Sequence, residues 1–178
     1  MEHYGGCDGV VTRGVCLTER RYADEDFFPR HLTPKENPFY LSLPYDDVND
    51  ARAAHQRERH LPWAHDPQYE DILADRSRSL MKNRWVEIRH EDRTCFAQVQ
   101  DAGPGKYFDP HYVFGDEDAR PLNQRYGGSG TDVSPALNGC LGFTELNGTS
   151  DRVDWRFVER RDVPDGPWTR IETTRNDG

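Results

Sequence analysis

The sequence lacks the features of several large protein classes. Its 178 residues contain no apolar run near the roughly 20 residues that a membrane-spanning helix needs, so we expect no transmembrane segment. No signal peptide is evident in it. It contains no Ser-His-Asp order and no Gly-rich nucleotide fingerprint, and the glycines at 127–130 are not followed by the helix and lysine of a phosphate-binding loop.

The sequence also has a deficit of positive charge. It holds 23 Lys and Arg against 32 Asp and Glu, which gives a formal net charge of −9. Binding to nucleic-acid phosphates needs clustered Lys and Arg, whereas the basic residues here are interleaved with acids. We therefore expect no nucleic-acid partner, while a neutral polymer such as a polysaccharide carries no such penalty.

The four cysteines form no CxxC pair, so the sequence does not predict a zinc ribbon. Three disulfide connectivities are possible. We expect Cys7–Cys16 together with Cys95–Cys140, because the first closes a short local loop and the second ties together two predicted strands. Two disulfides predict an exported protein, secreted or periplasmic. Buried free thiols are the alternative.

Aromatic residues and turn formers are abundant. With 8 Phe, 8 Tyr and 4 Trp the chain has too many aromatics for a disordered protein, although only 34% of its residues are hydrophobic. The 15 Gly and 12 Pro predict many turns and few long helices. The length fits one domain.

Local patterns predict a mainly β domain over residues 1–178. The best helix signal runs from Asp50 toward Arg59 and is stopped by Pro62. It lies in a probable helical insertion, 46–80, whereas 105–130 is a long loop and 159–178 is a C-terminal extension. A further helical turn or two is expected within 133–141, and a second short helix within 68–80. Strands are expected at 10–11, 15–17, 39–43, 85–88, 95–99 and 152–158, with a last edge strand at 168–173.

Two carboxylates stand at expected ends of regular structure. Asp101 follows a strand and precedes Ala-Gly-Pro, and Asp132 precedes a helical turn. Their spacing alone predicts that Asp132 caps the following helix and that Asp101 caps a turn.

The segments around these acids resemble a known group of domains. Residues 98–104 (QVQDAGP) resemble the V-x-D-x-G-P stretch of the rare lipoprotein A domain and are similar to V-T-D-x-x-P of bacterial expansins. Residues 130–136 (GTDVSPA) resemble their x-x-D-L-S-P-x-A/N-F motif, and an L-G pair follows at 141–142. Residues 153–158 resemble their last barrel strand, and weaker similarities cover 39–45 and 4–7.

The order of these motifs matches from about Tyr4 to Val158. The resemblance implies a six-stranded double-psi β-barrel, the fold shared by barwin, expansins and rare lipoprotein A, with a short helical insertion and long loops. It also implies that Asp132 is the essential acid and that Asp101 lies across the same groove.

The implied function is cleavage of cell-wall or peptidoglycan-type glycan by a lytic transglycosylase or glycoside hydrolase. Asp132 would protonate the glycosidic oxygen, and a buried Asp beside another Asp has the raised pKa that suits a proton donor. We expect a monomer that binds a polysaccharide and uses neither cofactor nor metal. The expected substrate-binding residues are Tyr4, Tyr45, His111, Tyr112, Thr131 and Ser134.

The sequence departs from the pattern of these families in places. The opening Thr of expansins has no clear match, and Gly103 stands where expansins have an aromatic residue. Two alternatives therefore stay open: a non-catalytic module that binds and loosens glycan, and a barwin-like protease inhibitor that uses the loop at 105–128. An open groove shared by Asp101 and Asp132 would favour the glycan-active readings.

Overall fold

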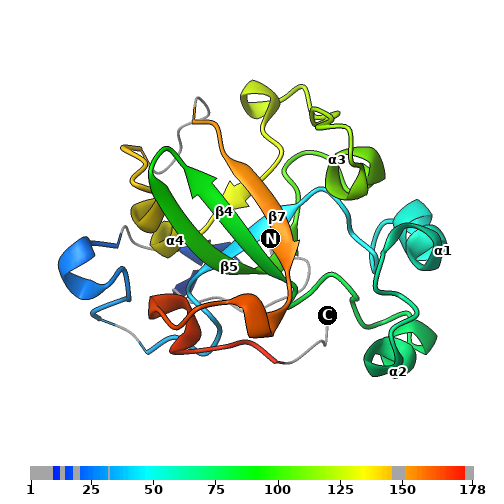
Figure 1. Ribbon diagram of the computed structural model, residues 1–178, viewed down its shortest axis with the longest axis horizontal. Coiled ribbons are helices and arrows are strands. Elements are labelled where there is room, and N and C mark those ends of the chain that lie inside the picture. Colours follow the sequence, from blue (N-terminus) through cyan, green and yellow to red (C-terminus); the bar gives the residue numbers. More distant parts are fainter. Residues whose placement is uncertain (1–9, 13–14, 18–20, 32, 146–150, 175–178) are drawn as a thin grey trace.

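Among the described residues, the main β-sheet of the chain is mixed and has five strands (Figure 1). We describe it from a computed structural model, for residues 10–12, 15–17, 21–31, 33–145 and 151–174. β3 runs parallel to β5, and the other neighbours in the sheet are antiparallel. In spatial order the strands are β6 (Asp132–Val133), β3 (Tyr40–Leu43), β5 (Arg93–Ala102), β4 (Trp85–His90) and β7 (Asp154–Val158).

The interior of the sheet is a run of buried strand residues. Leu41 and Leu43 of β3 are inaccessible to solvent, and even Ser42 between them is buried. A strand that is covered on both faces has this continuous burial instead of an alternating pattern. β3 is therefore a buried inner strand, and β5 and the short β6 pair with it on either side.

The β4–β5 hairpin and β7 follow the expected pattern. The hairpin turns at Glu91 and Asp92, where Glu91 adopts a positive φ of 53°. In β7, Trp155 and Phe157 pack against the core, whereas the alternating residues Asp154 and Arg156 are exposed. The alternation of side chains along a strand explains this division.

The helices are short and have clear ends. In α1 (Ala51–His60) the Asp50 side chain accepts hydrogen bonds from the first turn, and in α4 (Pro135–Leu141) the Ser134 hydroxyl accepts one from Leu137 N at 3.2 Å. α1 and α2 (Glu70–Ala74) lie together beside the sheet, and α4 lies at its other side (Figure 1). α3 (Pro110–Phe114) belongs to the long loop.

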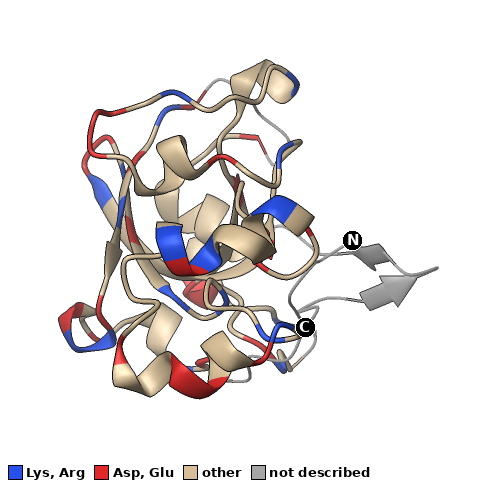
Figure 2. Ribbon diagram, turned by 90° about the vertical axis from the view of Figure 1, so that its right-hand side faces the viewer, with Lys and Arg blue, Asp and Glu red and all other residues tan. Residues whose placement is uncertain are grey.

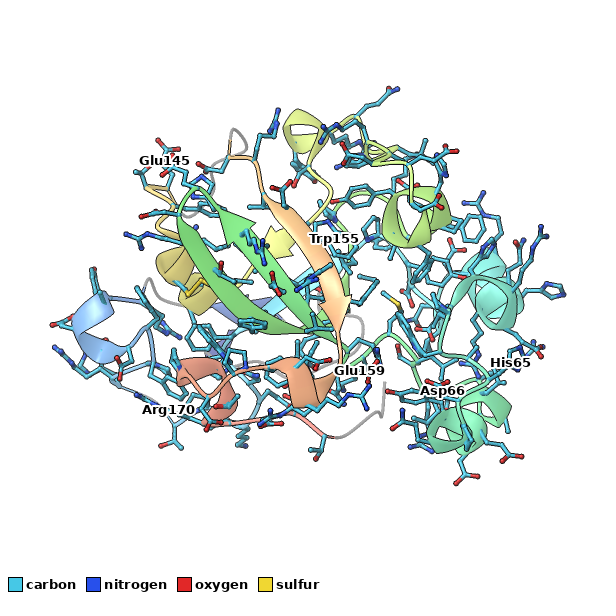
Figure 3. The ribbon with its side chains drawn as sticks, viewed as in Figure 1. His65, Asp66, Glu145, Trp155, Glu159 and Arg170 are labelled. Atoms are coloured by element: carbon cyan, nitrogen blue, oxygen red, sulfur yellow. A yellow bond between two sulfur atoms is a disulfide. The ribbon has the colours of Figure 1, made fainter. Side chains whose placement is uncertain are left out.

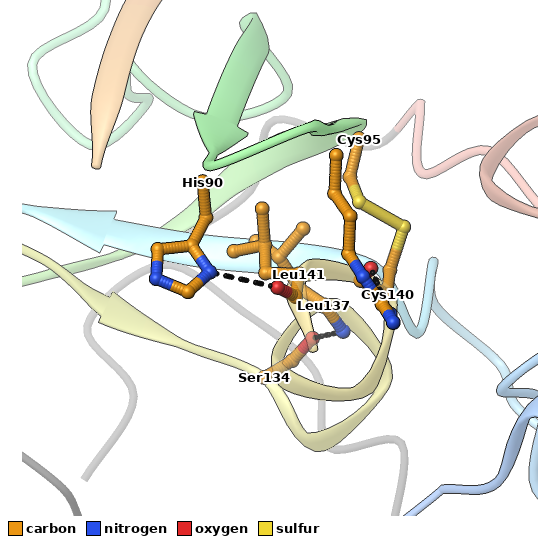
Figure 4. Close-up of a disulfide and its surroundings, with 7 residues drawn as sticks. His90, Cys95, Ser134, Leu137, Cys140 and Leu141 are labelled. Atoms are coloured by element: carbon orange, nitrogen blue, oxygen red, sulfur yellow. Dashed lines mark hydrogen bonds between the residues drawn. A yellow bond between two sulfur atoms is a disulfide. The ribbon is translucent and has the colours of Figure 1, made fainter. Parts of the chain in front are cut away.

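A disulfide joins α4 to the sheet. Cys95 of β5 and Cys140 of α4 are bonded, with their Cα atoms 6.3 Å apart (Figure 4). This pairing confirms the sequence-based prediction for these two residues. The second expected pair includes Cys7, which lies outside the described residues.

The prediction of a mainly β chain is confirmed, with some short helices beside the sheet, but a closed six-stranded barrel is not confirmed. In the part of the chain that the structure describes, the main sheet has five strands and is open, with β6 and β7 at its edges. A separate hairpin joins β1 (Val10–Thr12) to β2 (Val15–Leu17).

The expected edge strand at 168–173 is wrong. A 3₁₀ turn occupies Pro167–Thr169, and no described strand follows it. The backbone of Thr173 instead bonds to one side chain, because its N–H donates to Gln98 Oε1 and its carbonyl accepts from Gln98 Nε2, each at 2.9 Å. A buried glutamine thus replaces the partner strand.

Charges of both signs are spread over the surface. Figure 2 shows Lys and Arg interspersed with Asp and Glu along the ribbon. Among the described residues, no helix has the length and apolar character that crossing a membrane requires.

Candidate functional site

An open pocket of about 1350 Å³ lies beside the edge strand β6. One side is formed by the long loop, from Tyr112 to Thr131, and another by β7 and the residues before it. Asp132 and Val133 of β6 lie in its wall. The pocket therefore forms between segments that are far apart in the sequence.

Asp132 is positioned by the backbone of β6. Its N–H donates to Ser42 Oγ at 3.1 Å, and Ser42 is its partner in the β3–β6 ladder. The helix that follows is capped by Ser134, so the sequence-based alternative of Asp132 as a helix cap is wrong. Within the described residues the Asp132 carboxylate accepts no hydrogen bond and forms no ion pair, which leaves it available to a ligand in the pocket.

Asp101 lies on the opposite side of β3 from Asp132. It is in register with Ser42 in the β3–β5 ladder, so Ser42 stands between the two acids. One carboxylate oxygen of Asp101 accepts from the N–H of Ala102 at 2.8 Å. The two acids are thus brought together on strands that flank β3, not on facing loops, and only Asp132 lines the pocket.

The surroundings of Asp132 favour its protonated form. Although the residue is exposed, the pocket walls withdraw water from its carboxyl group, and this desolvation is the largest cause that raises its pKa. The negative charge of Asp101 raises the pKa further. Asp132 therefore has the electrostatic environment of a proton donor.

Two of the predicted substrate-binding residues line the pocket. Tyr112 is half-buried, and its hydroxyl accepts a hydrogen bond from Trp155 Nε1 at 3.0 Å. Burial raises the pKa of this phenol, which keeps it neutral and able to donate its proton in a hydrogen bond. Thr131 donates its hydroxyl to Ser42 O at 2.8 Å and so holds the loop against β3.

The other predicted binding residues lie elsewhere. Tyr45 is fully buried, with its ring packed against Phe114 at 5.0 Å between centroids, so it is a core residue. Ser134 is buried and donates to Pro38 O at 2.7 Å in addition to capping α4. His111 is exposed but does not line the pocket, and Tyr4 lies outside the described residues.

Sequence reasoning missed several pocket residues. Trp155, which is labelled in Figure 3, lies in the expected strand at 152–158 and packs against the core, yet it also lines the pocket. Arg156 was not considered, although alternation in β7 places it on the exposed face, where it pairs with Glu87 at 2.7 Å. Tyr126 directly precedes the glycines at 127–130 and also lines the pocket. The residues next to Tyr126 in the sequence do not indicate a binding site, because the pocket forms only when this loop folds beside β7.

The described residues contain no cluster of three or more His, Cys, Asp or Glu side chains that could hold a metal ion. His55, His60 and His65, which recur at intervals of five in the sequence, form no such cluster.

No family model, curated protein or solved structure matches this chain.

Proposed function

We propose that this protein acts on a polysaccharide of the cell wall or peptidoglycan type, with Asp132 as general acid and base. The observation that carries the proposal is a carboxyl group of raised pKa in the wall of a large open pocket. A raised pKa keeps the carboxyl group protonated to a higher pH than an ordinary Asp, which suits it to donate a proton to a glycosidic oxygen.

The size of the pocket supports a polymeric substrate. Pockets for small molecules usually enclose about 300–1000 Å³. The volume of about 1350 Å³ is larger than this range and leaves room for more than one sugar unit.

The chemistry needs only the residues that are present. Asp132 would protonate the leaving oxygen as the bond to the anomeric carbon breaks. In a lytic transglycosylase a hydroxyl of the substrate then attacks that carbon and returns its proton to the carboxylate, whereas in a hydrolase water takes this role. Asp101 would support the reaction by keeping the pKa of Asp132 high.

The finer fold assignment is part of the same proposal. We assign the chain to the double-psi β-barrels related to rare lipoprotein A, expansins and barwin. Three of the segments with motif similarity, in β3, β5 and β6, are direct neighbours in the sheet, which supports this assignment. A secreted or periplasmic monomer is the corresponding proposal for location and assembly.

The test is incubation of the purified protein with peptidoglycan and with cellulose, followed by chromatography and mass spectrometry of the soluble products. Asp132→Asn should reduce the rate of product release by about a hundredfold or more, the usual effect of removing a positioned acid. Asp118→Asn is the matched control, because Asp118 lines the same pocket but its side chain is 88% exposed and paired with Arg120. Equal rates for wild type and Asp132→Asn would refute the catalytic role.

Two alternatives correspond to other outcomes. Binding of glycan without soluble products, altered in Asp132→Asn, would identify an expansin-like loosening module. Inhibition of a protease without glycan binding would identify a barwin-like inhibitor. The pocket is lined by Asp132 and not by Asp101, so the open groove shared by both acids that would favour the glycan-active alternatives is not found within the described residues. What supports the glycan proposal over the inhibitor is that residues of the long loop between Tyr112 and Thr131 line the pocket.

A further inference from the structure

An exposed aromatic side chain stands at the pocket that contains Asp132. Among the large apolar side chains that the structure describes, four are exposed: Tyr22, Tyr107, Leu122 and Tyr126. Of these only Tyr126, which is 60% exposed, lines the pocket. Singly exposed side chains are common on protein surfaces, whereas aromatic side chains that line a pocket are typical of ligand-binding sites.

The loop that carries Tyr126 is tied down on both sides of it. Asn123 is buried, and its side chain accepts from Arg125 N at 3.0 Å and donates to Ser129 O at 2.8 Å. These two bonds bridge the turn around Tyr126. Upstream, buried Asp109 accepts from Leu122 N at 2.7 Å, which joins the same loop to the start of α3.

The downstream end of the loop packs against the pocket wall. A Cβ atom at Gly130 would lie only 2.4 Å from the Tyr112 hydroxyl, so there is space here for glycine alone. Tyr112 is in turn bonded to Trp155, whose ring packs against Phe157 at 5.4 Å between centroids. The loop that carries Tyr126 is therefore packed, through Gly130, against the aromatic residues Tyr112 and Trp155 of the pocket.

Tyr126 itself has an unusual backbone conformation. Its φ is 51°, in the left-handed region that non-glycine residues rarely adopt, and Gly127 and Gly128 after it have φ of 68° and 79°. Such a conformation is unfavourable for a tyrosine and persists only where the surroundings impose it. Here the Asn123 bonds impose it, and the result is an aromatic ring presented at the pocket.

We propose that Tyr126 is a sugar-stacking residue, which binds the apolar face of a pyranose ring in the polysaccharide chain whose linkage lies at Asp132. The inference rests on the proposed function. It assigns to Tyr126 affinity for the substrate and no part in proton transfer. A pyranose ring carries C–H groups on its faces, and these pack on an aromatic ring much as other apolar groups do.

The test is equilibrium binding of soluble β-1,4-linked hexasaccharides of glucose and of N-acetylglucosamine. Every variant carries Asp132→Asn, so that the probes are not cleaved. Adding Tyr126→Ala should raise Kd for a probe that binds by about fivefold to tenfold, the effect of losing one aromatic contact and its buried area. Tyr126→Phe should bind like the parent, because the ring and not the hydroxyl makes the contact.

Leu122→Ala is the matched control. Leu122 belongs to the same loop and is equally exposed at 60%, but it does not line the pocket, so its truncation should leave Kd unchanged. In the protein with Asp132 intact, Tyr126→Ala should raise KM more than it lowers kcat.

The outcomes separate the two proposals. Unchanged Kd in Tyr126→Ala, with the parent binding a probe, would overturn the stacking role and leave the proposed function standing. An equal loss in Leu122→Ala would also overturn it, because the effect would then come from the loop as a whole. Failure of the parent and of wild type to bind or cleave any glycan would overturn both proposals.

Discussion

Asp132 illustrates how surroundings set the chemistry of one residue. Its backbone is fixed by β3, yet its carboxylate accepts no hydrogen bond from the described residues. Its charged form therefore loses hydration without gaining a partner, and nearby Asp101 adds repulsion. The same group that suits proton donation is thus one that destabilises the folded chain when it ionises.

This conflict predicts a pH-dependent gain in stability for Asp132→Asn. The folded-state pKa of Asp132 is raised, so ionisation penalises the folded state above that pKa, and the penalty disappears below the ordinary Asp pKa of about 3.9. The variant should melt at a higher temperature than wild type at pH 7, and the difference should vanish near pH 3. Thermal unfolding followed by circular dichroism across this range measures it. A difference that does not change with pH would contradict the prediction, and Asp118→Asn is the exposed control.

Asp101→Asn should shift the pH dependence of glycan cleavage. Removing this negative charge lowers the pKa of Asp132, because Asp101 is one of the two causes that raise it. A general acid works in its protonated form, so activity should be lost at a lower pH than in wild type. The measurement is the rate of product release against pH. A loss of activity at the same or a higher pH would show that Asp101 acts in another way.

Among the elements, a buried arginine holds α1 to the segment that contains α2. Arg57 of α1 is only 3% exposed, and its guanidinium donates to the carbonyls of Ile72, Leu73, Asp75 and Arg78 at 2.6–3.0 Å. Three of these carbonyls lie in and just after α2. One side chain on α1 therefore satisfies the end of α2, where a short helix leaves carbonyls unpaired.

Arg57→Met should loosen this contact. The substitution keeps an apolar stem but leaves several carbonyls without a donor, and we expect a loss of roughly 2–4 kcal/mol in the free energy of unfolding. Urea denaturation measures the loss, and limited proteolysis should show earlier cleavage within 70–80. Arg59→Ala is the control, because Arg59 is exposed on the same helix. Equal stability of Arg57→Met and wild type would refute the structural role.

At the scale of the whole molecule, α4 is held to the sheet covalently. The bond between Cys95 and Cys140 closes a loop with a sequence separation of 45 that contains the long loop and β6 (Figure 4). Opening this loop enlarges the set of unfolded conformations, and the chain-entropy relation gives about 4 kcal/mol for a loop of this length.

The double variant Cys95→Ala with Cys140→Ala should therefore unfold more easily, by about 2–4 kcal/mol. Guanidinium denaturation under oxidising conditions gives the value, with wild type verified by mass to hold the bridge as the reference. Because α4 follows directly on β6, glycan binding at the pocket should weaken as well. A midpoint equal to that of wild type would contradict the prediction.

Most of the local elements could be predicted from the amino-acid sequence. Alternation in 85–88 and 152–158 identified two strands, the Asp50 signal located α1, and Ser134-Pro135 marked the start of α4. These features depend on interactions between residues a few positions apart, so local sequence patterns are enough to predict them. Asp101 and Asp132 stood out for the same reason, as acids at the ends of regular structure.

The residues that share a site could not be predicted from the sequence, because long-range folding brings them together. Tyr45 resembled a motif residue, but α1 and Phe114 bury it, whereas Trp155 and Tyr126 became pocket residues through contacts with distant segments. The edge strand expected at 168–173 was replaced by bonds to Gln98, a residue some 75 positions away. Burial, desolvation and pairing across a sheet depend on such long-range contacts, which local patterns do not encode.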